Sequence, residues 1–129
     1  MRLPLGFQDE EQFTEILRRI QDAADAEEVL VGIRGSSTTG QNSQTGMIFG
    51  LDSDFDFFLV SDVLHHQALR KGANDANGVL RVGATQRYFP ALAVIERKIS
   101  QELGRKTTIR IFSRAGYDRV KAETDILGE

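Results

Sequence analysis

Cysteine is absent from the 129-residue chain, which excludes a disulfide framework, a thiolate nucleophile and a zinc–thiolate site. The two histidines, His65 and His66, lie on a predicted helix without metal-ligand spacing, so we set them aside as ligands and catalysts. No apolar stretch approaches the roughly 20 residues needed to span a bilayer, and the amino terminus lacks the apolar region of a signal peptide. The sequence therefore predicts one domain, residues 1–129, with no membrane span.

Positive charge is missing from residues 35–65, which hold four Asp and no Lys or Arg. Residues 66–121, by contrast, hold twelve basic and four acidic residues, although the net charge of the whole chain is −3. Such asymmetry reflects either scattered solvated side chains or a surface for an anionic partner. An anionic partner that suits the basic segment is a triphosphate or an RNA backbone.

Hydrophobic periodicity predicts the main helices and strands. The expected helices cover residues 9–25, about 61–72, 91–103 and, more weakly, 113–126. The expected strands cover residues 29–33, 53–60 and 107–112, and residues 35–50 and 73–84 are expected to be loops. This order of elements predicts an α/β (α+β) fold, in which helices flank a small mixed β-sheet.

An Asp-x-Asp pattern lies inside the second predicted strand. Side chains at positions i and i+2 of a strand share a face and lie roughly 6–7 Å apart. Asp54 and Asp56 are therefore expected to project together, while Phe55, Phe57 and Leu59 point into a core on the other face. Two neighbouring carboxylates repel each other unless a cation lies between them, and a hard divalent cation such as Mg²⁺ prefers carboxylate oxygens. The pattern predicts a metal site at Asp54 and Asp56.

A small polar turn, RGSSTTG at residues 34–40, follows the first predicted strand. Gly35 and Ser36 offer backbone N–H groups and a hydroxyl without steric bulk, which suits a phosphate. The hydroxyls of Ser37 and Thr39 are either further phosphate donors or simple turn formers. Arg34 can contact the same phosphate or pair with Asp54. Phosphate beside metal-binding carboxylates indicates phosphoryl or nucleotidyl transfer.

These two motifs resemble those of the nucleotidyltransferase superfamily typified by DNA polymerase beta. In that family a Gly-Ser turn holds the triphosphate and the paired Asp residues bind two Mg²⁺; the matching positions here are Gly35-Ser36 and Asp54-Phe55-Asp56-Phe57. A longer string is similar to carboxy-terminal toxin domains of filamentous-haemagglutinin-like and contact-dependent growth inhibition proteins. That string comprises residues 34–40, Thr45-Gly46, residues 53–56 and Gly104-Arg105-Lys106. The resemblance covers about residues 5–112.

The resemblance implies an enzyme that transfers a nucleotide from a nucleoside triphosphate to an acceptor, such as the 3′ end of a tRNA or a protein hydroxyl. Asp54 and Asp56 would be its catalytic and Mg²⁺-binding residues. The residues implied to contact the nucleotide are Arg34, Gly35, Ser36, Ser37, Thr39 and Arg110. The resemblance also implies secretion as part of a larger toxin, action in the cytoplasm of the target cell, and a cognate immunity protein.

Two departures from the family pattern leave alternatives open. Residues 40–51 lengthen the loop between the motifs, and Arg110 occupies the slot where a later strand usually supplies a third carboxylate. A cation at Arg110 would repel a metal and attract a phosphate, so Asp52, Asp118 or a base from the substrate would have to replace that carboxylate. Alternatively, the domain is a catalytically inactive module that binds a nucleotide or a protein partner. Met1 is consistent with a free cytoplasmic nucleotidyltransferase paired with an antitoxin, or with a piece of a longer toxin.

Overall fold

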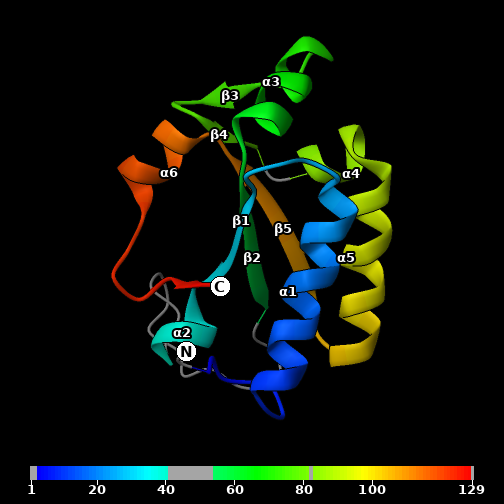
Figure 1. The fold of residues 1–129 in the computed structure, drawn as a ribbon, viewed down its shortest axis with the longest axis vertical. Coiled ribbons are helices and arrows are strands. Elements are labelled where there is room, and N and C mark those ends of the chain that lie inside the picture. Colours follow the sequence, from blue (N-terminus) through cyan, green and yellow to red (C-terminus); the bar gives the residue numbers. More distant parts are fainter. Residues whose placement is uncertain (1–2, 41–53, 82, 129) are drawn as a thin grey trace.

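The computed structural model describes residues 3–40, 54–81 and 83–128, which form helices packed around a mixed six-stranded sheet (Figure 1). The helices are α1 (Glu10–Ala24), α2 (Ser36–Thr39), α3 (Asp62–Arg70), α4 (Ala84–Tyr88), α5 (Pro90–Leu103) and α6 (Arg114–Val120). The strands are β1 (Leu30–Arg34), β2 (Phe55–Val60), β3 (Asp75–Ala76), β4 (Val79–Leu80), β5 (Thr107–Phe112) and β6 (Ile126–Leu127). The α+β class expected from the sequence is confirmed.

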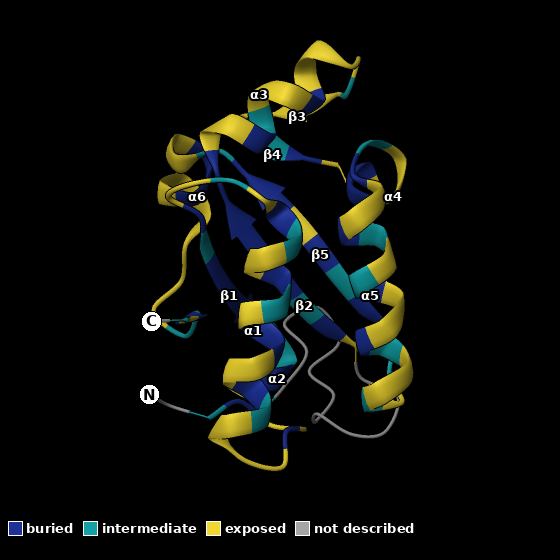
Figure 2. Cartoon of the chain, turned by 45° about the vertical axis from the view of Figure 1, so that its right-hand side comes forward, coloured by how far each residue is buried: buried dark blue, intermediate teal, exposed yellow. Residues whose placement is uncertain are grey.

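The two long helices begin and end where local chemistry dictates. At the start of α1 the Asp9 side chain accepts a hydrogen bond from Gln12 N, and Asp25 ends the helix in the left-handed conformation. Pro90 occupies the first turn of α5, where its missing N–H costs nothing, and Gly104 ends that helix with φ 66°. The apolar stripes of both helices face the sheet, whereas their outer sides are exposed (Figure 2).

Strand β2 lies at the centre of the sheet, in the order β3-β4-β5-β2-β1-β6. It pairs antiparallel with β1 and parallel with β5. Its side chains at odd-numbered positions, Phe55, Phe57 and Leu59, are at most 1% exposed and pack into the main core, as the alternating pattern predicts. On the opposite face, Phe58 stacks on Tyr117 of α6 with ring centroids 5.0 Å apart. Helix α6 thus covers only part of this second face.

The edge of β5 that β4 does not reach is completed by side chains from the helices. Glu96, a buried residue of α5, accepts a hydrogen bond from Ile109 N at 2.8 Å, and Ser100 accepts one from Thr107 N at 2.9 Å. Thr85 of α4 donates its hydroxyl to Ile109 O at 2.5 Å. These bonds satisfy buried backbone groups and hold β5 in place, so the buried carboxylate of Glu96 has a structural role.

Two expectations from the sequence are wrong in detail. Residues 73–84, expected to be a loop, contain the hairpin of β3 and β4, which turns at Asn77 and Gly78 with φ 55° and 87°. Positive φ at both central residues is the geometry of a tight two-residue hairpin. The helix expected over residues 113–126 covers only Arg114–Val120, after which the chain reaches the sheet edge as β6 beside β1.

Candidate functional site

A cleft of about 590 Å³ opens on the second face of the sheet, next to the part that α6 covers. It lies where β1 ends and β2 and β5 begin, so three strands contribute to its floor. Its charged lining residues are Arg34, Asp54, Asp56, Arg81, Lys106, Arg110 and Asp125. A cleft with convergent charged groups on strand ends is the default place to look for ligand chemistry.

Both predicted metal-binding carboxylates line this cleft. Asp54 is exposed and directly precedes β2, while Asp56 is the second residue of that strand and is half-buried. The Thr108 hydroxyl donates a hydrogen bond to Asp56 Oδ1 at 3.1 Å. Burial raises the pKa of the Asp56 carboxyl above its usual range; the Thr108 hydrogen bond opposes this rise and the nearby Asp54 carboxylate adds to it. The ionised form of Asp56 is therefore disfavoured by burial, and a nearby positive charge would stabilise it.

The Gly35 turn lies beside Asp56 because Arg34, the last residue of β1, pairs in register with Asp56. Gly35 has φ 88° and ψ −155°, a region that residues with a side chain essentially never occupy. A Cβ atom at this position would also lie 2.7 Å from Asp56 Oδ2. Glycine is thus required twice, for its backbone conformation and for the close approach of a carboxylate.

The hydroxyl residues of the turn divide into two groups. Thr39 lines the cleft, and its hydroxyl lies 3.4 Å from Gly35 O. Ser36 and Ser37 are not among the cleft-lining residues. Ser37 is buried, where its hydroxyl donates to Leu5 O at 2.8 Å and its carbonyl accepts from Leu5 N at 2.8 Å. The structure therefore assigns Ser37 an anchoring role for the amino-terminal segment, and its predicted phosphate contact gains no support.

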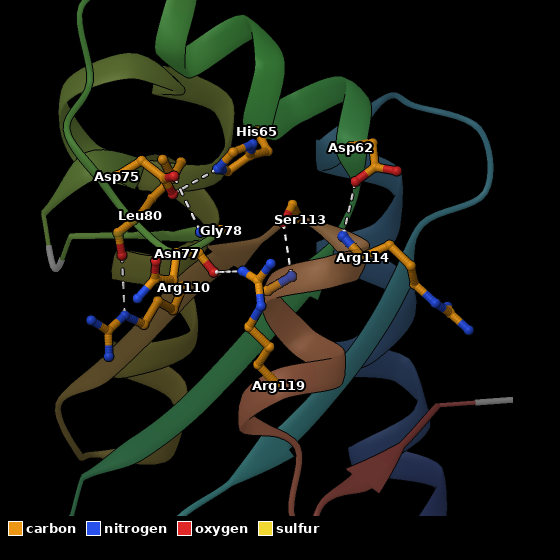
Figure 3. Close-up of polar contacts among 11 residues, drawn as sticks. Asp62, His65, Asp75, Asn77, Gly78, Leu80, Arg110, Ser113, Arg114 and Arg119 are labelled. Carbon is orange, nitrogen blue, oxygen red and sulfur yellow. Dashed lines mark hydrogen bonds and ion pairs between the residues drawn. The ribbon is translucent and has the colours of Figure 1, made fainter.

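Strand β5 brings no acid to the position beside Asp56. The residue paired in register with Asp56 is Thr108, whereas Arg110 pairs with Phe58, two positions further along the strand. Arg110 is exposed, lines the cleft, and donates a hydrogen bond from Nε to Leu80 O at 3.2 Å (Figure 3). At this position β5 therefore supplies a hydroxyl, with the guanidinium of Arg110 further along the same face.

Of the two alternative acids considered from the sequence, Asp118 does not fill this gap. Asp118 is an exposed residue of α6 that lies 3.7 Å from Lys121 Nζ, and it does not line the cleft. Asp52, together with most of the long loop between the motifs, lies outside the described residues.

Sequence reasoning overlooked Asp125, which lines the cleft from the carboxy-terminal segment. Its carboxylate is only 3% exposed and forms an ion pair with Arg34, with Oδ1 and Nε 3.3 Å apart. Arg34 thus pairs with Asp125 rather than with Asp54. Only the long-range pairing of β6 with β1 places Asp125 here, so the local pattern carried no signal for it.

Three basic residues form the opposite wall of the cleft. Arg81, Lys106 and Arg110 are all exposed, and none forms an ion pair with a carboxylate in the part of the chain that the structure describes. The hairpin that carries Arg81 is fastened to α6, since Arg119 donates to Asn77 O at 2.8 Å (Figure 3). Among the described residues, cations without a direct ion-pair partner that lie beside two carboxylates suit an anionic ligand that also carries or recruits a cation.

Comparisons with known proteins add no family assignment: protein-family models, curated proteins and solved structures each gave no match. In residues 3–40, 54–81 and 83–128, no three His, Asp or Glu side chains are grouped closely enough to hold a metal ion by themselves. Nor does any helix in those ranges combine the length and apolar character needed to cross a membrane.

Proposed function

We propose that this domain is a Mg²⁺-dependent nucleotidyltransferase, which transfers a nucleotide from a nucleoside triphosphate to an acceptor such as tRNA or a protein hydroxyl. One observation carries the proposal: Asp54, Asp56 and the Gly35 turn, predicted separately from the sequence, line one cleft. Carboxylates at a strand end beside an open glycine turn are what a triphosphate with its cation requires.

The donor set fits Mg²⁺ in type. Both side chains are carboxylates, the raised pKa of Asp56 reflects a negative charge in need of compensation, and Gly35 places no Cβ against Asp56 Oδ2. When bound, the ion would neutralise phosphate charge and favour the ionised form of an attacking hydroxyl. Since the third acid of the cleft, Asp125, is paired with Arg34, further ligands would come from water and the triphosphate, as is usual for Mg²⁺.

The chain's own residues would bind and orient the reactants. Arg34 and the Gly35 turn face the phosphates from the β1 side, while Lys106, Arg110 and Arg81 supply positive charge from the β5 side. Nucleotidyl transfer asks little covalent chemistry of a protein, since most of the rate comes from positioning and charge stabilisation. A cleft with opposed charged walls is suited to both tasks.

The biological setting proposed rests on the sequence resemblance alone. The domain would be secreted as the carboxy-terminal part of a larger toxin, act in the cytoplasm of a target cell, and be neutralised by a cognate immunity protein. The local excess of basic residues in 66–121 supports an anionic acceptor such as RNA.

A labelling experiment tests the proposal. The domain is mixed with MgCl₂, one α-labelled ribonucleoside triphosphate at a time, total bacterial RNA and lysate protein, with Asp54→Ala as the inactive variant and Glu123→Gln as the matched control. We expect label on RNA or protein with the wild type and with Glu123→Gln, and none with Asp54→Ala at an unchanged melting temperature. Equal labelling by Asp54→Ala would refute the assigned role of the carboxylates.

A second candidate function is a nucleotide-binding module without catalysis. It is favoured by β5, which places Thr108 rather than an acid beside Asp56, and Arg110 further along the same face. Under this alternative, triphosphate binds in the cleft with little dependence on Mg²⁺, and no label is transferred to any acceptor. Covalent transfer in the labelling experiment would eliminate it.

A further inference from the structure

The last segment of the described chain, residues 121–128, forms a strap across one end of the cleft. Its β6 residues Ile126 and Leu127 pair with β1, and Gly128 N donates to Val31 O at 2.8 Å. The strap brings Ala122, Thr124 and Asp125 into the cleft lining. It therefore builds one wall of the site opposite the basic residues of β5.

The strap and α6 together enclose Arg34. Its Nε lies 3.3 Å from Asp125 Oδ1, and its Nη2 donates to Val120 O at 2.7 Å. The guanidinium carbon lies 5.9 Å and 5.7 Å from the ring centroids of Phe58 and Phe112. A guanidinium held by two polar contacts and two aromatic rings has little rotational freedom, yet the side chain stays 25% exposed at the cleft.

Asp125 is itself fixed by bonds that leave one oxygen for Arg34. Its Oδ2 accepts hydrogen bonds from the Tyr117 hydroxyl at 3.1 Å and from Ala122 N at 3.0 Å. Burial and the adjacent carboxylate raise the pKa of Tyr117 to about 12, so Tyr117 remains a donor at neutral pH. Oδ1 accepts no hydrogen bond from the described residues, and Arg34 supplies its only countercharge there.

We propose that Asp125 is a positioning residue that orients Arg34 toward the phosphate chain of the bound triphosphate. The inference rests on the proposed function, because the phosphate that Arg34 would contact belongs to the triphosphate proposed there. A buried ion pair is a weak source of stability compared with apolar packing of similar volume. The arrangement is better explained by the direction it gives to Arg34, whose neighbour in the chain is Gly35 of the cleft-lining turn.

The orientation of Arg34 can be measured without a ligand. Nitrogen-15 relaxation of the Arg34 Nε–Hε group should report a rigid side chain in the wild type and in Glu123→Gln, which removes an exposed acid from the same strap. Asp125→Asn keeps the shape but removes the charge, and should make the group mobile on the nanosecond timescale. A rigid Arg34 in Asp125→Asn would overturn the inference.

Binding of inorganic tripolyphosphate and of ATP, each with MgCl₂, measures the consequence. Asp125→Asn should raise Kd about fivefold, the scale of one partly exposed ion pair, with no such change in Glu123→Gln. In an Arg34→Gln background, the further change to Asn at position 125 should have no effect on Kd, because Asp125 acts through Arg34. If Asp125→Asn does not fold, Tyr117→Phe should give a smaller increase in Kd.

The outcomes separate this inference from the function it rests on. Failure of the wild type to bind either probe would contradict both. Binding by the wild type that weakens in Arg34→Gln and stays unchanged in Asp125→Asn or Tyr117→Phe would refute only the role of Asp125. If Asp125→Asn raised Kd by the same factor in the wild type and in Arg34→Gln, the role of Asp125 would also be refuted.

Discussion

The two faces of the β2–β5 pair differ in what their side chains do. On one face, Phe57, Leu59 and Ile111 are at most 1% exposed and pack against α1 and α5. On the other face, at the start of the same strands, Asp56 and Thr108 carry a hydrogen bond at the floor of an open cleft. Packing accounts fully for the first face, whereas the polar residues of the second are not needed for the core. The second face is therefore the one on which we propose the ligand site.

The second face itself is divided into a buried apolar part and an open cleft. Towards the ends of β2 and β5, Phe58 and Phe112 are buried under Tyr117 and form a second apolar cluster. The cleft begins where that cover stops, and Arg34 lies at the transition, over both rings. Arg34 thus contacts the apolar cluster and also lines the cleft.

The largest expected effect is a loss of stability when a side chain of the packed face is removed. Phe57→Ala removes a side chain that is 1% exposed, with its ring centroid 6.2 Å from that of Phe7. It should lower the free energy of unfolding by about 3–5 kcal/mol in urea titrations, because the cavity left behind cannot collapse fully. Lys106→Ala on the cleft wall should change that free energy by less than about 0.5 kcal/mol. Similar losses in both variants would contradict the division of the two faces.

The next largest effect is the loss of stability when Gly35 of the turn is replaced. Gly35→Ala forces a side chain into a backbone region reserved for glycine and 2.7 Å from Asp56 Oδ2, so it should cost about 2–3 kcal/mol of unfolding free energy. Gly104→Ala is the matched control, since Gly104 is left-handed but has open space around it. That control should cost about 1 kcal/mol. Equal costs would show that the carboxylate contact adds nothing.

A smaller effect concerns the basic wall. Lys106→Ala should weaken tripolyphosphate binding about fivefold at low salt and less at high salt, because an exposed cation acts through a screened field. Lys98→Ala, an exposed residue of α5 outside the cleft lining, should leave affinity unchanged. Binding is measured by calorimetry at two salt concentrations. If Lys98→Ala weakened tripolyphosphate binding as much as Lys106→Ala, the basic residues of the cleft would have no specific part in binding.

The smallest effect is on stability and comes from Asp56. Its raised pKa means that the ionised carboxylate favours the unfolded chain, so this residue's contribution to stability is present below the unfolded pKa and is lost as pH rises through the folded one. Asp56→Asn should therefore raise the melting temperature by roughly 2 °C at pH 7 and by nothing below pH 3.8. Thr108→Val removes the opposing hydrogen bond and should lower the wild-type melting temperature at pH 7. A difference between Asp56→Asn and wild type that is constant with pH would contradict this assignment.

Local patterns predicted the long elements well and the tertiary contacts poorly. The spacing of Phe13, Ile16 and Ile20 indicated α1, and the alternation around Phe57 indicated which face of β2 is buried. The hairpin at Asn77-Gly78 was missed because its strands have only two residues each, although that dipeptide is a strong turn signal.

The candidate site was only partly readable for the same reason. Asp54, Asp56 and Gly35 lie in two neighbouring segments, and strand pairing alone brings these together. Asp125 and the register that places Thr108 beside Asp56 depend on segments more than 50 residues away. No local periodicity encodes such pairings, which is why the sequence pointed to Arg110 and overlooked Asp125.

The most direct test of the central claim is the Mg²⁺ dependence of triphosphate binding. Calorimetry with ATP, with and without MgCl₂, compares the wild type with Asp54→Asn/Asp56→Asn, whose fold is checked by its melting curve. The account predicts Mg²⁺-dependent binding by the wild type and loss of that dependence in a double variant that melts at the same temperature or higher. Binding that is equally strong in the double variant, or absent from the wild type, would show that the cleft is not a metal–triphosphate site.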